Sequence, residues 1–272
     1  MNILEKIIAY KKPLVTEKKV KEPVAALRES AYFNRKPFSL KQALADTDSS
    51  GIIAEFKRKS PSKPAINLGA SVKEVTKGYQ EGGAAALSIL TDEHFFGGKI
   101  QDIVQVREQI DIPILRKDFI FDPYQVYEAK SIGADAILLI AEVLSKEKIL
   151  ELSSLAWQLR LEVLMEIHSA EQLSKISPFI DIIGVNNRNL KTFETSIQNS
   201  IELAPEIPND VLRISESGIH SVQEIQSLQS VGYKGFLIGE QFMKTQDPAN
   251  TCRNFIQEIK GLKSMQFSKK HP

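Results

Sequence analysis

Ionisable and polar residues follow short apolar runs at regular intervals along this chain. The run at residues 52–54 leads into Glu55 and Lys57, and the run at residues 112–115 leads into Lys117. Carboxylates and amines placed beside a reacting group transfer protons as general acids and bases. The other apolar runs lead into Thr91, Asp92, Glu93, Glu142, Glu166, Asn186, Asn187, Arg188, Glu216, Ser217, Gly218, Gly239 and Glu240.

The spacing of these runs predicts the fold. Strands are expected to begin near residues 51, 85, 112, 135, 162, 181, 211 and 235, and the segments between them carry the apolar period of helices. Buried parallel strands are continuous apolar runs, and a barrel of such units takes about 250 residues. A doubly wound open sheet is the competing architecture, but it has fewer strands and a GxGxxG loop after the first. We therefore predict an α/β protein, a (β/α)8 TIM barrel whose site lies at the C-terminal ends of its strands.

Residues 1–48 differ from the rest and predict an N-terminal helical extension. Apolar residues at helical spacing indicate an amphipathic helix over residues 1–10. Further helices are expected at residues 24–30 and 39–45, the last of them capped by Ser39.

The remaining boundaries follow from composition. We interpret the lysine-rich segment 11–21 as solvated helix faces and a linker, and the alternative is that the extension covers one end of the barrel. We expect a single domain over residues 1–272, with the barrel at 49–262 and a disordered tail at 263–272.

The bulk composition excludes several classes of function. Lys and Arg total 35 against 34 for Asp and Glu, so the net charge of +1 attracts neither nucleic acid nor an anionic membrane. No apolar run approaches the roughly 20 residues that span a bilayer, and the first residues lack the apolar core of a signal peptide. We therefore expect a cytoplasmic protein. Cys252 is the only cysteine and is expected to be an inert helical thiol, and the four histidines, including the loop residue His168, lack metal-site spacing.

Strand alternation orients the first candidates. Glu55 and Lys57 are two residues apart and share one face of a strand, which in a barrel can point inward. Partial desolvation of Lys117 at an inward strand end is expected to lower its pKa toward that of a useful general acid, and an ion pair with Asp118 is the structural alternative. Glu166 closes the fifth run, where a lone carboxylate is more often functional in a barrel than elsewhere.

A basic loop follows the first strand. Lys57, Arg58, Lys59 and Lys63 together suit an anionic ligand. A solvated loop is the alternative and accounts for Arg58, Lys59 and Lys63. It does not account for Lys57, which begins on an apolar strand.

Two glycine-bearing loops predict a phosphate site. Gly218 follows the seventh run and Gly239 the eighth. Loops after these two strands bind phosphate in many barrels, because their backbone N–H groups approach the oxygens closely. Asn186, at the end of the sixth run, offers a donor and acceptors to a polar substrate or else caps its own loop.

Motifs at the ends of the runs form an ordered set. They are Glu55-Phe56-Lys57-Arg58-Lys59-Ser60-Pro61-Ser62, Leu90-Thr91-Asp92, Phe95-Phe96-Gly97-Gly98, Leu115-Arg116-Lys117-Asp118-Phe119, Glu166-Ile167, Gly184-Val185-Asn186-Asn187-Arg188-Asn189-Leu190, Ser215-Glu216-Ser217-Gly218-Ile219 and Phe236-Leu237-Ile238-Gly239. Over residues 51–243 this set resembles indole-3-glycerol phosphate synthase, and the N-terminal helices fit the same family. The resemblance implies ring closure of carboxyphenylamino-deoxyribulose phosphate to indole-3-glycerol phosphate, with loss of carbon dioxide and water, in tryptophan biosynthesis.

The resemblance implies a role for each catalytic candidate. Lys117 is expected to be the general acid that protonates the ribulose carbonyl, and Glu166 is expected to act in the dehydration step. Glu55 and Asn186 would hold the hydroxyls or the anilino nitrogen. Lys57 would be a cation for the anionic groups of the substrate and share in proton transfer.

The resemblance also implies the residues that bind the substrate. These are Ser60, Phe96, Phe119, Arg188, Glu216 and Ser217, with the two phenylalanines walling the anthranilate pocket. Gly218, Gly239 and the N–H of Glu240 would cradle the phosphate. The Glu240 carboxylate would repel a phosphate, so we expect this side chain to turn away.

The expected partner is a phosphorylated small molecule, with no nucleic acid and no membrane, and the chain is expected to be a monomer or a weak dimer. The resemblance implies no cofactor and no metal ion, because the aromatic ring itself drives the attack. Two alternatives stay open. One is a sugar-phosphate isomerase with a Cys–Asp pair, for which Cys252 is poorly placed, and the other is a barrel that only binds phosphate.

Overall fold

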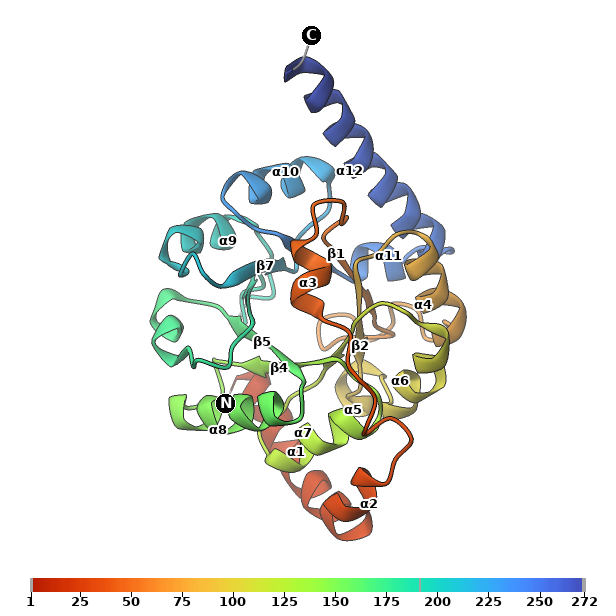
Figure 1. Cartoon of the computed structure of the whole chain (residues 1–272), viewed down its shortest axis with the longest axis vertical. Helices are drawn as coiled ribbons and strands as arrows, with labels where there is room; N and C mark the ends of the chain where they lie inside the picture. Colours follow the sequence, from red (N-terminus) through yellow and green to blue (C-terminus); the bar gives the residue numbers. More distant parts are fainter. Residues whose placement is uncertain (1, 191, 271–272) are drawn as a thin grey trace.

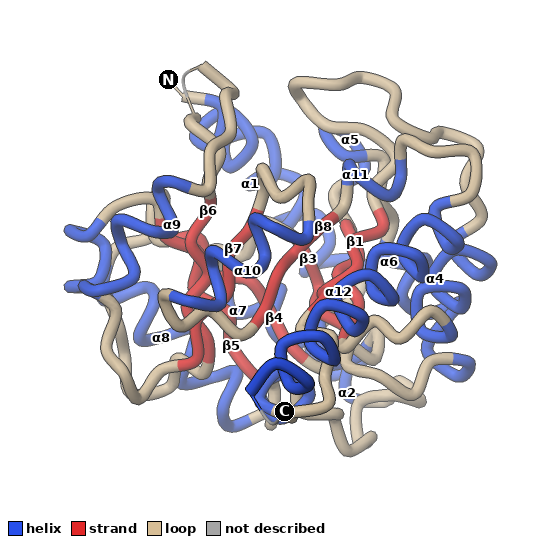
Figure 2. Tube along the Cα trace, turned by 90° about the horizontal axis from the view of Figure 1, so that it is seen from above, coloured by secondary structure: helices blue, strands red, loops and turns tan. Residues whose placement is uncertain are grey.

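The computed structural model describes residues 2–190 and 192–270, with side chains through residue 261, and its centre is a closed barrel. Eight parallel strands pair in sequence order, and the last closes on the first (Figure 2). The predicted (β/α)8 TIM barrel is confirmed, and each strand begins within two residues of its predicted start. The strands are β1 (Ile52–Phe56), β2 (Ala86–Leu90), β3 (Ile114–Lys117), β4 (Ala136–Ile140), β5 (Glu162–Ile167), β6 (Ile182–Asn186), β7 (Leu212–Glu216) and β8 (Gly235–Ile238).

Helices surround the barrel and connect its strands (Figure 1). They are α4 (Val72–Glu81), α5 (Glu93–Phe96), α6 (Ile100–Val106), α7 (Pro123–Ser131), α8 (Lys146–Gln158), α9 (Gln198–Leu203), α10 (Val222–Ser230), α11 (Glu240–Met243) and α12 (Pro248–Lys270), with 3-10 turns at Arg107–Gln109, Ala170–Lys175 and Ala204–Glu206. Over the described parts of the chain, none of these helices has the length and apolar character needed to cross a membrane. The tail predicted at residues 263–272 lies outside the residues whose side chains are described and stays a prediction.

Strand alternation divides the apolar side chains into two cores. Ile52, Ala54 and Phe56 of β1 face the surrounding helices, whereas Ile53 points into the barrel. The same alternation places Glu55 on the inward side, one step beyond Ile53, as predicted from the sequence. The barrel interior is filled by Ile53, Ala86, Leu115, Ala136, Leu138, Ile140, Leu164, Ile182, Ile214 and Leu237.

The N-terminal extension contains three helices, α1 (Ile3–Lys21), α2 (Val24–Arg28) and α3 (Leu40–Ala45). The cap predicted for the third helix is confirmed, because Ser39 accepts a hydrogen bond from the N–H of Gln42. The predicted linker within residues 11–21 is wrong, since α1 continues through that segment. Its lysines pair with acids of the barrel, Lys18 with Glu128 at 2.8 Å among them, and these pairs favour a docked helix over a solvated linker.

The extension closes both ends of the barrel. Leu40 and Leu44 of α3 are buried against the inner core at the N-terminal ends of the strands, and α3 lies in front of the barrel in Figure 1. Leu4 and Ile7 of α1 are buried against the same core at the opposite end. The interpretation that the extension covers an end of the barrel is confirmed, and α1 forms a roof over the C-terminal ends where the site was predicted.

A buried carboxylate holds the extension to the bottom of the barrel. Asp135, immediately before β4, is fully buried and ion-paired with Arg35 of the extension and with Arg107 at 2.6 Å. It also accepts hydrogen bonds from the backbone N–H groups of Phe38, at 2.8 Å, and Ile114, at 2.7 Å. The four donors offset the cost of burying this charge.

We predict that Asp135→Asn destabilises the fold by about 3–5 kcal/mol, because the buried Arg107 guanidinium loses its counter-ion. The measurement is the free energy of unfolding in urea. The control is Glu81→Gln, which removes an exposed pair with Lys77 at 3.9 Å and should cost less than about 1 kcal/mol. Equal effects of the two substitutions would contradict the role given to Asp135.

Candidate active site

Two adjoining cavities lie at the C-terminal ends of the strands. One, of about 130 Å³, lies beneath α1, and the other, of about 380 Å³, lies beside the loops after β7 and β8. They share Glu55, Lys57, Arg188 and Ser217 in their walls. A ligand can therefore extend from one cavity into the other.

Every site residue predicted from the sequence lines one or both cavities. The cavity beneath α1 is bounded by Lys117, Glu166, Asn186, Glu216, Ser60, Phe96 and Phe119 together with the shared residues. The other cavity is bounded by Gly218, Gly239 and Glu240 with the same shared residues. These positions come from β1, β2, β3, β5, β6, β7 and β8 or the loops that follow them. The closed barrel is what brings them together.

Lys117 is the centre of the first cavity. Its Nζ lies 2.9 Å from an oxygen of Glu166 and 2.9 Å from an oxygen of Glu216. The other oxygen of Glu166 accepts a hydrogen bond from the amide of Asn186 at 3.1 Å. The alternative of an ion pair with Asp118 is wrong, because Asp118 points to the opposite side of β3 and pairs with Lys11 and Arg116.

The predicted direction of the Lys117 pKa is also wrong. Burial alone would lower the pKa of this ammonium, but the carboxylates of Glu166, Glu216 and Glu55 outweigh burial and raise it above its usual range. Lys117 therefore keeps its proton at neutral pH. It can act as an acid only when a substrate oxygen that gains negative charge accepts that proton.

The two carboxylates around Lys117 differ in charge. Burial, opposed by the attraction of Lys117 and reinforced by the neighbouring carboxylates of Glu166 and Glu55, raises the pKa of Glu216 to about 7. Burial also favours the neutral form of Glu166, but Lys117 and then His168 lower its pKa below the usual value. One ammonium thus keeps Glu166 ionised while Glu216 titrates near neutral pH.

Glycine on the neighbouring strand makes room for Glu216. A Cβ atom at Gly184 would overlap Oε1 of Glu216 in its present position, so glycine leaves room for this carboxylate. This oxygen is buried and has no hydrogen-bond partner among the described residues, whereas Oε2 binds Lys117. An unpaired buried oxygen costs free energy in the free enzyme, and a donor from a ligand would relieve that cost.

Glu55 and Lys57 form a second acid–base pair. Nζ of Lys57 lies 2.6 Å from Oε1 of Glu55, and Ser88 donates to the other oxygen at 3.3 Å. A Cβ atom at Gly239 would overlap the Glu55 carboxylate, so this glycine opens the passage between β1 and the loop after β8. The inward direction predicted for the pair is confirmed.

The cavity beneath α1 is apolar on the side away from Lys117. Leu4 and Ile7 of α1 form its roof, and the rings of Phe96 and Phe119 lie 5.7 Å apart in its wall. A planar aromatic group fits such a wall. The sequence predicted that the apolar residues at the start of the extension form a helix. It did not predict that this helix contributes to the site.

The second cavity is built from loops with unusual backbone. Ser217 and Gly218 both have positive φ, 68° and 69°, directly after β7. Glu240 does not turn away as predicted: its carboxylate is ion-paired with Lys63 and lies 3.8 Å from Arg188. The two cations draw this carboxylate across the cavity.

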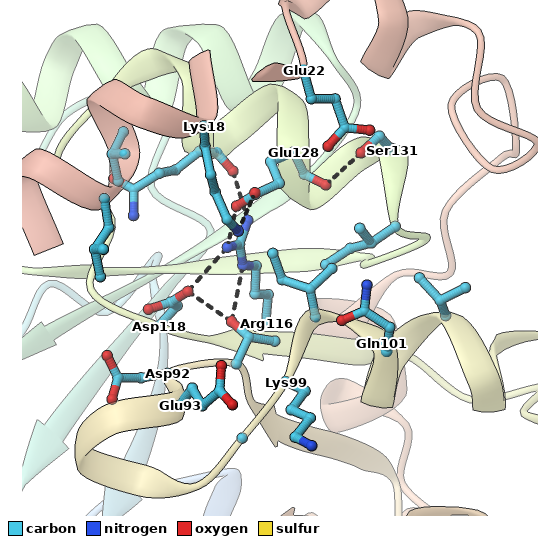
Figure 3. A pocket seen from close by; sticks show the side chains of 18 of the residues that line it. Lys18, Glu22, Asp92, Glu93, Lys99, Gln101, Arg116, Asp118, Glu128 and Ser131 are labelled. Carbon is cyan, nitrogen blue, oxygen red and sulfur yellow. Dashed lines mark hydrogen bonds and ion pairs between the residues drawn. The ribbon is translucent and has the colours of Figure 1, made fainter. Parts of the chain in front are cut away.

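Sequence reasoning missed a buried charge network on the outer side of β3. Arg116 is 1% exposed and binds Asp118 at 3.0 Å and Glu128 at 2.5 Å (Figure 3). Lys11 of α1 reaches Asp118 at 2.5 Å. The network lines a cavity of about 1090 Å³ whose buried charges neutralise one another, so its size does not make it the site. Strand alternation could have predicted that Arg116 and Lys117 point to opposite sides of β3. The sequence of the strand does not indicate that Arg116 pairs with Glu128.

Arg58 is not the solvated loop residue that the alternative interpretation allowed, whereas His168 lies in the loop directly after β5, as predicted. Arg58 makes two hydrogen bonds to Asp102, at 2.6 and 3.0 Å, and so anchors the loop after β1. His168 places Nε2 3.7 Å from Glu166, with both ring nitrogens buried.

Cys252 is buried on α12 with a pKa raised by burial to about 12, as expected for an inert thiol. Within the described residues, no group of three or more His, Cys, Asp or Glu side chains could hold a metal ion.

The geometry defines a class of protein. A parallel eight-stranded barrel with an ammonium between carboxylates at its C-terminal end, and beside it a cavity lined by Lys57, Lys63 and Arg188 between glycine-bearing loops, is a (β/α)8-barrel enzyme for an anionic small molecule. Solved structures agree on the fold alone. A 3-hexulose-6-phosphate synthase from Salmonella typhimurium matches with a TM-score of 0.61 and 13% identity, covering 76% of this chain and 97% of its own. A thiamine phosphate pyrophosphorylase from Pyrococcus furiosus matches with a TM-score of 0.56 and 14% identity, covering 81% and 99%.

Sequence comparison identifies the family. The family model described as indole-3-glycerol phosphate synthase matches residues 4–255. Proteins named indole-3-glycerol phosphate synthase from Bacteroides thetaiotaomicron and Carboxydothermus hydrogenoformans are 51% and 42% identical, over 95% and 90% of this chain and 99% and 96% of theirs. The chain belongs to the indole-3-glycerol phosphate synthase family. It is a decarboxylating carbon–carbon lyase of tryptophan biosynthesis.

The raised pKa of Glu216 predicts a pH-dependent stability difference from Glu216→Gln. The folded protein keeps this proton up to about pH 7, whereas the unfolded chain loses it near the usual value of 4.5. The stability that this proton confers is therefore complete at low pH and lost as the pH rises to about 7. Relative to the variant, the wild type should lose on the order of 3 kcal/mol across that window.

Unfolding free energies between about pH 4.5 and pH 8 measure this difference. Glu202→Gln, on the exposed face of α9, should follow the wild-type profile throughout. Parallel profiles for wild type and Glu216→Gln would show that Glu216 does not titrate in this window.

Proposed function

We propose that the two cavities bind carboxyphenylamino-deoxyribulose phosphate and that Lys117 and Glu166 close its indole ring. The observation that carries this proposal is the Lys117 ammonium, which is held 2.9 Å from each of two buried carboxylates and faces an apolar cavity. A proton donor of this kind suits a carbonyl oxygen that becomes an alkoxide during attack by an aromatic ring.

The shapes of the cavities support one orientation of the substrate. The anthranilate ring lies between Phe96 and Phe119 under α1, where apolar contact favours it. The phosphate lies in the second cavity near Gly218 and Gly239, with Lys57, Arg188 and Ser217 between the two ends. The ribulose chain then crosses in front of Lys117, and Ser60 contacts it from the loop after β1.

Ring closure begins when the ring carbon that bears the carboxylate attacks the ribulose carbonyl carbon. The carbonyl π electrons move to oxygen, and Lys117 gives that oxygen a proton. Carbon dioxide then leaves, and the electrons of its bond return to the ring and restore aromaticity. Glu166 and Glu216 stabilise the ammonium before the transfer, so the cation is positioned without reorganisation at the moment of reaction.

Dehydration follows on the same side of the site. The new hydroxyl leaves as water after it gains a proton, and the adjacent carbon bound to nitrogen loses one. Glu166, ionised and held by Asn186 at 3.1 Å, accepts that second proton. Lys57, paired with Glu55 at 2.6 Å, is placed to supply the first, and Glu55 and Asn186 orient the hydroxyls or the anilino nitrogen.

The proposed function also implies which partners the protein binds. The near balance of charge, +1 over the whole chain, supports a small phosphorylated substrate as the partner, with neither nucleic acid nor a membrane surface. We assign the chain to the cytoplasm, as a monomer or a weak dimer, in keeping with a biosynthetic enzyme.

Lys117→Met should abolish ring closure while the substrate still binds. Loss of a positioned proton donor costs about 10²–10⁴-fold in kcat, whereas the apolar and phosphate cavities remain. The assay mixes purified protein with carboxyphenylamino-deoxyribulose phosphate, without metal or nucleotide, and follows indole fluorescence. Lys117→Arg keeps a cation but holds its proton more tightly, so it should also be slow.

The control is Lys59→Met on the loop after β1. Lys59 donates to the carbonyl of His94 at 2.8 Å and touches neither Glu166 nor Glu216 in the structure, so ring closure should persist. Wild-type turnover with an equally active Lys117→Met would remove Lys117 from the mechanism. Absence of product from the wild type, with the substrate bound, would leave a phosphate-binding barrel of other chemistry.

A further inference from the structure

The cavity beside the glycine loops contains a carboxylate of its own. Glu240 begins α11, lines the 380 Å³ cavity and is 23% exposed. One of its oxygens is ion-paired with Lys63, and the other lies 3.8 Å from Nη2 of Arg188. An anion from the protein therefore lies between cations in the cavity assigned to the phosphate.

Glu240 connects three loops of the site. Lys63 belongs to a tight turn in which the N–H of Ser60 donates to the carbonyl of Lys63 at 2.8 Å and the N–H of Lys63 donates back at 3.0 Å. Arg188 follows β6 and donates to the carbonyl of Phe193 at 3.0 Å. The Glu240 carboxylate thus holds the loops after β1 and β6 to the loop after β8.

The charge of Glu240 is fixed by these cations. Partial burial works against ionisation, but Lys63, Lys57 and Arg188 lower the pKa of Glu240 below its usual value, so the side chain is an anion at neutral pH. A phosphate monoester carries about −1.5 to −2 charges at that pH and accepts hydrogen bonds from the same kinds of donor. The carboxylate and the phosphate therefore compete for one set of cations.

We propose that Glu240 is a resident counter-ion of the phosphate site, displaced from Lys63 and Arg188 when a phosphate group binds. In the free enzyme it keeps the turn at Ser60 docked over the cavity. On binding, the two cations change partner from carboxylate to phosphate, and on release they return. Glu240 therefore weakens phosphate binding and lowers the affinity of the site for its phosphorylated product. This inference rests on the assignment of the cavity to the phosphate group.

The test is equilibrium binding of inorganic phosphate to wild type and Glu240→Gln, measured by isothermal titration calorimetry. Glutamine keeps the size of the side chain and removes its charge, so phosphate should bind about three- to tenfold more tightly. The advantage should shrink between about 0.05 and 0.5 M salt, because the cavity is open to screening ions. Equal or weaker binding by a folded Glu240→Gln protein would overturn the proposal.

Glu194→Gln is the matched control. Glu194 lines the same cavity, but its carboxylate accepts a hydrogen bond from Thr192 at 3.1 Å and makes no ion pair with Lys63 or Arg188 in the structure. The same loss of one negative charge there should leave phosphate affinity within about twofold of wild type, since it releases neither Lys63 nor Arg188 from a carboxylate partner. An equal gain from both variants would mean that only the net charge of the cavity matters, which contradicts a specific counter-ion.

A double-mutant cycle with Lys63→Gln tests the exchange itself. In the wild type Lys63 is already occupied, so its loss should change phosphate affinity little; in the Glu240→Gln background its loss should cost most of the gain. Additive effects of the two substitutions on phosphate affinity would contradict an exchange of partners by Lys63. Because these titrations need no turnover, wild type that binds phosphate but forms no indole product would refute the proposed function and leave the counter-ion intact.

Discussion

The structure depends on one buried charge arrangement, a single ammonium between two carboxylates at the end of the barrel. Lys117 is on β3, Glu166 on β5 and Glu216 on β7, so the three meet only because the sheet is closed. One positive charge cannot neutralise two negative ones in a buried site, and the conflict is resolved by raising the pKa of Glu216 while Glu166 stays ionised. The site can therefore hold a proton and accept one at neutral pH.

A consequence of strand geometry is that β3 serves two purposes at once. Lys117 points into the barrel, while its neighbours Arg116 and Asp118 belong to the network on the outer side of the strand (Figure 3). Lys11 of α1 pairs with Asp118, so the strand that carries Lys117 also anchors the helix that roofs the cavity beneath α1. Any displacement of β3 would move the acid and the roof together, which keeps Lys117 in register with the apolar wall.

Much of this could be predicted from the sequence. The apolar runs determine the strands, and alternation determines which residues face inward, so Glu55, Lys117 and Glu166 could be identified without coordinates. What could not be predicted depends on distant partners. The pKa of Lys117 has the opposite direction to the one expected, because burial is a local property whereas the opposing carboxylates come from strands about 50 and 100 residues further along the chain.

The same distinction explains Glu240 and the lysine-rich part of α1. For Glu240 the expectation rested on repulsion by a phosphate alone, and for the lysine-rich segment it rested on the rule that charged residues on a helix face usually meet water. The barrel instead brings acidic and basic residues from separate loops together at one end, and there the lysines form ion pairs with carboxylates. Closing the sheet concentrates charge at the candidate site, where three cations each have a protein partner: Glu55 for Lys57, Glu166 for Lys117, Glu240 for Lys63. An anionic ligand that binds such cations must exchange ion pairs with the protein, so its affinity depends on the partner that is given up as much as on the one that is gained.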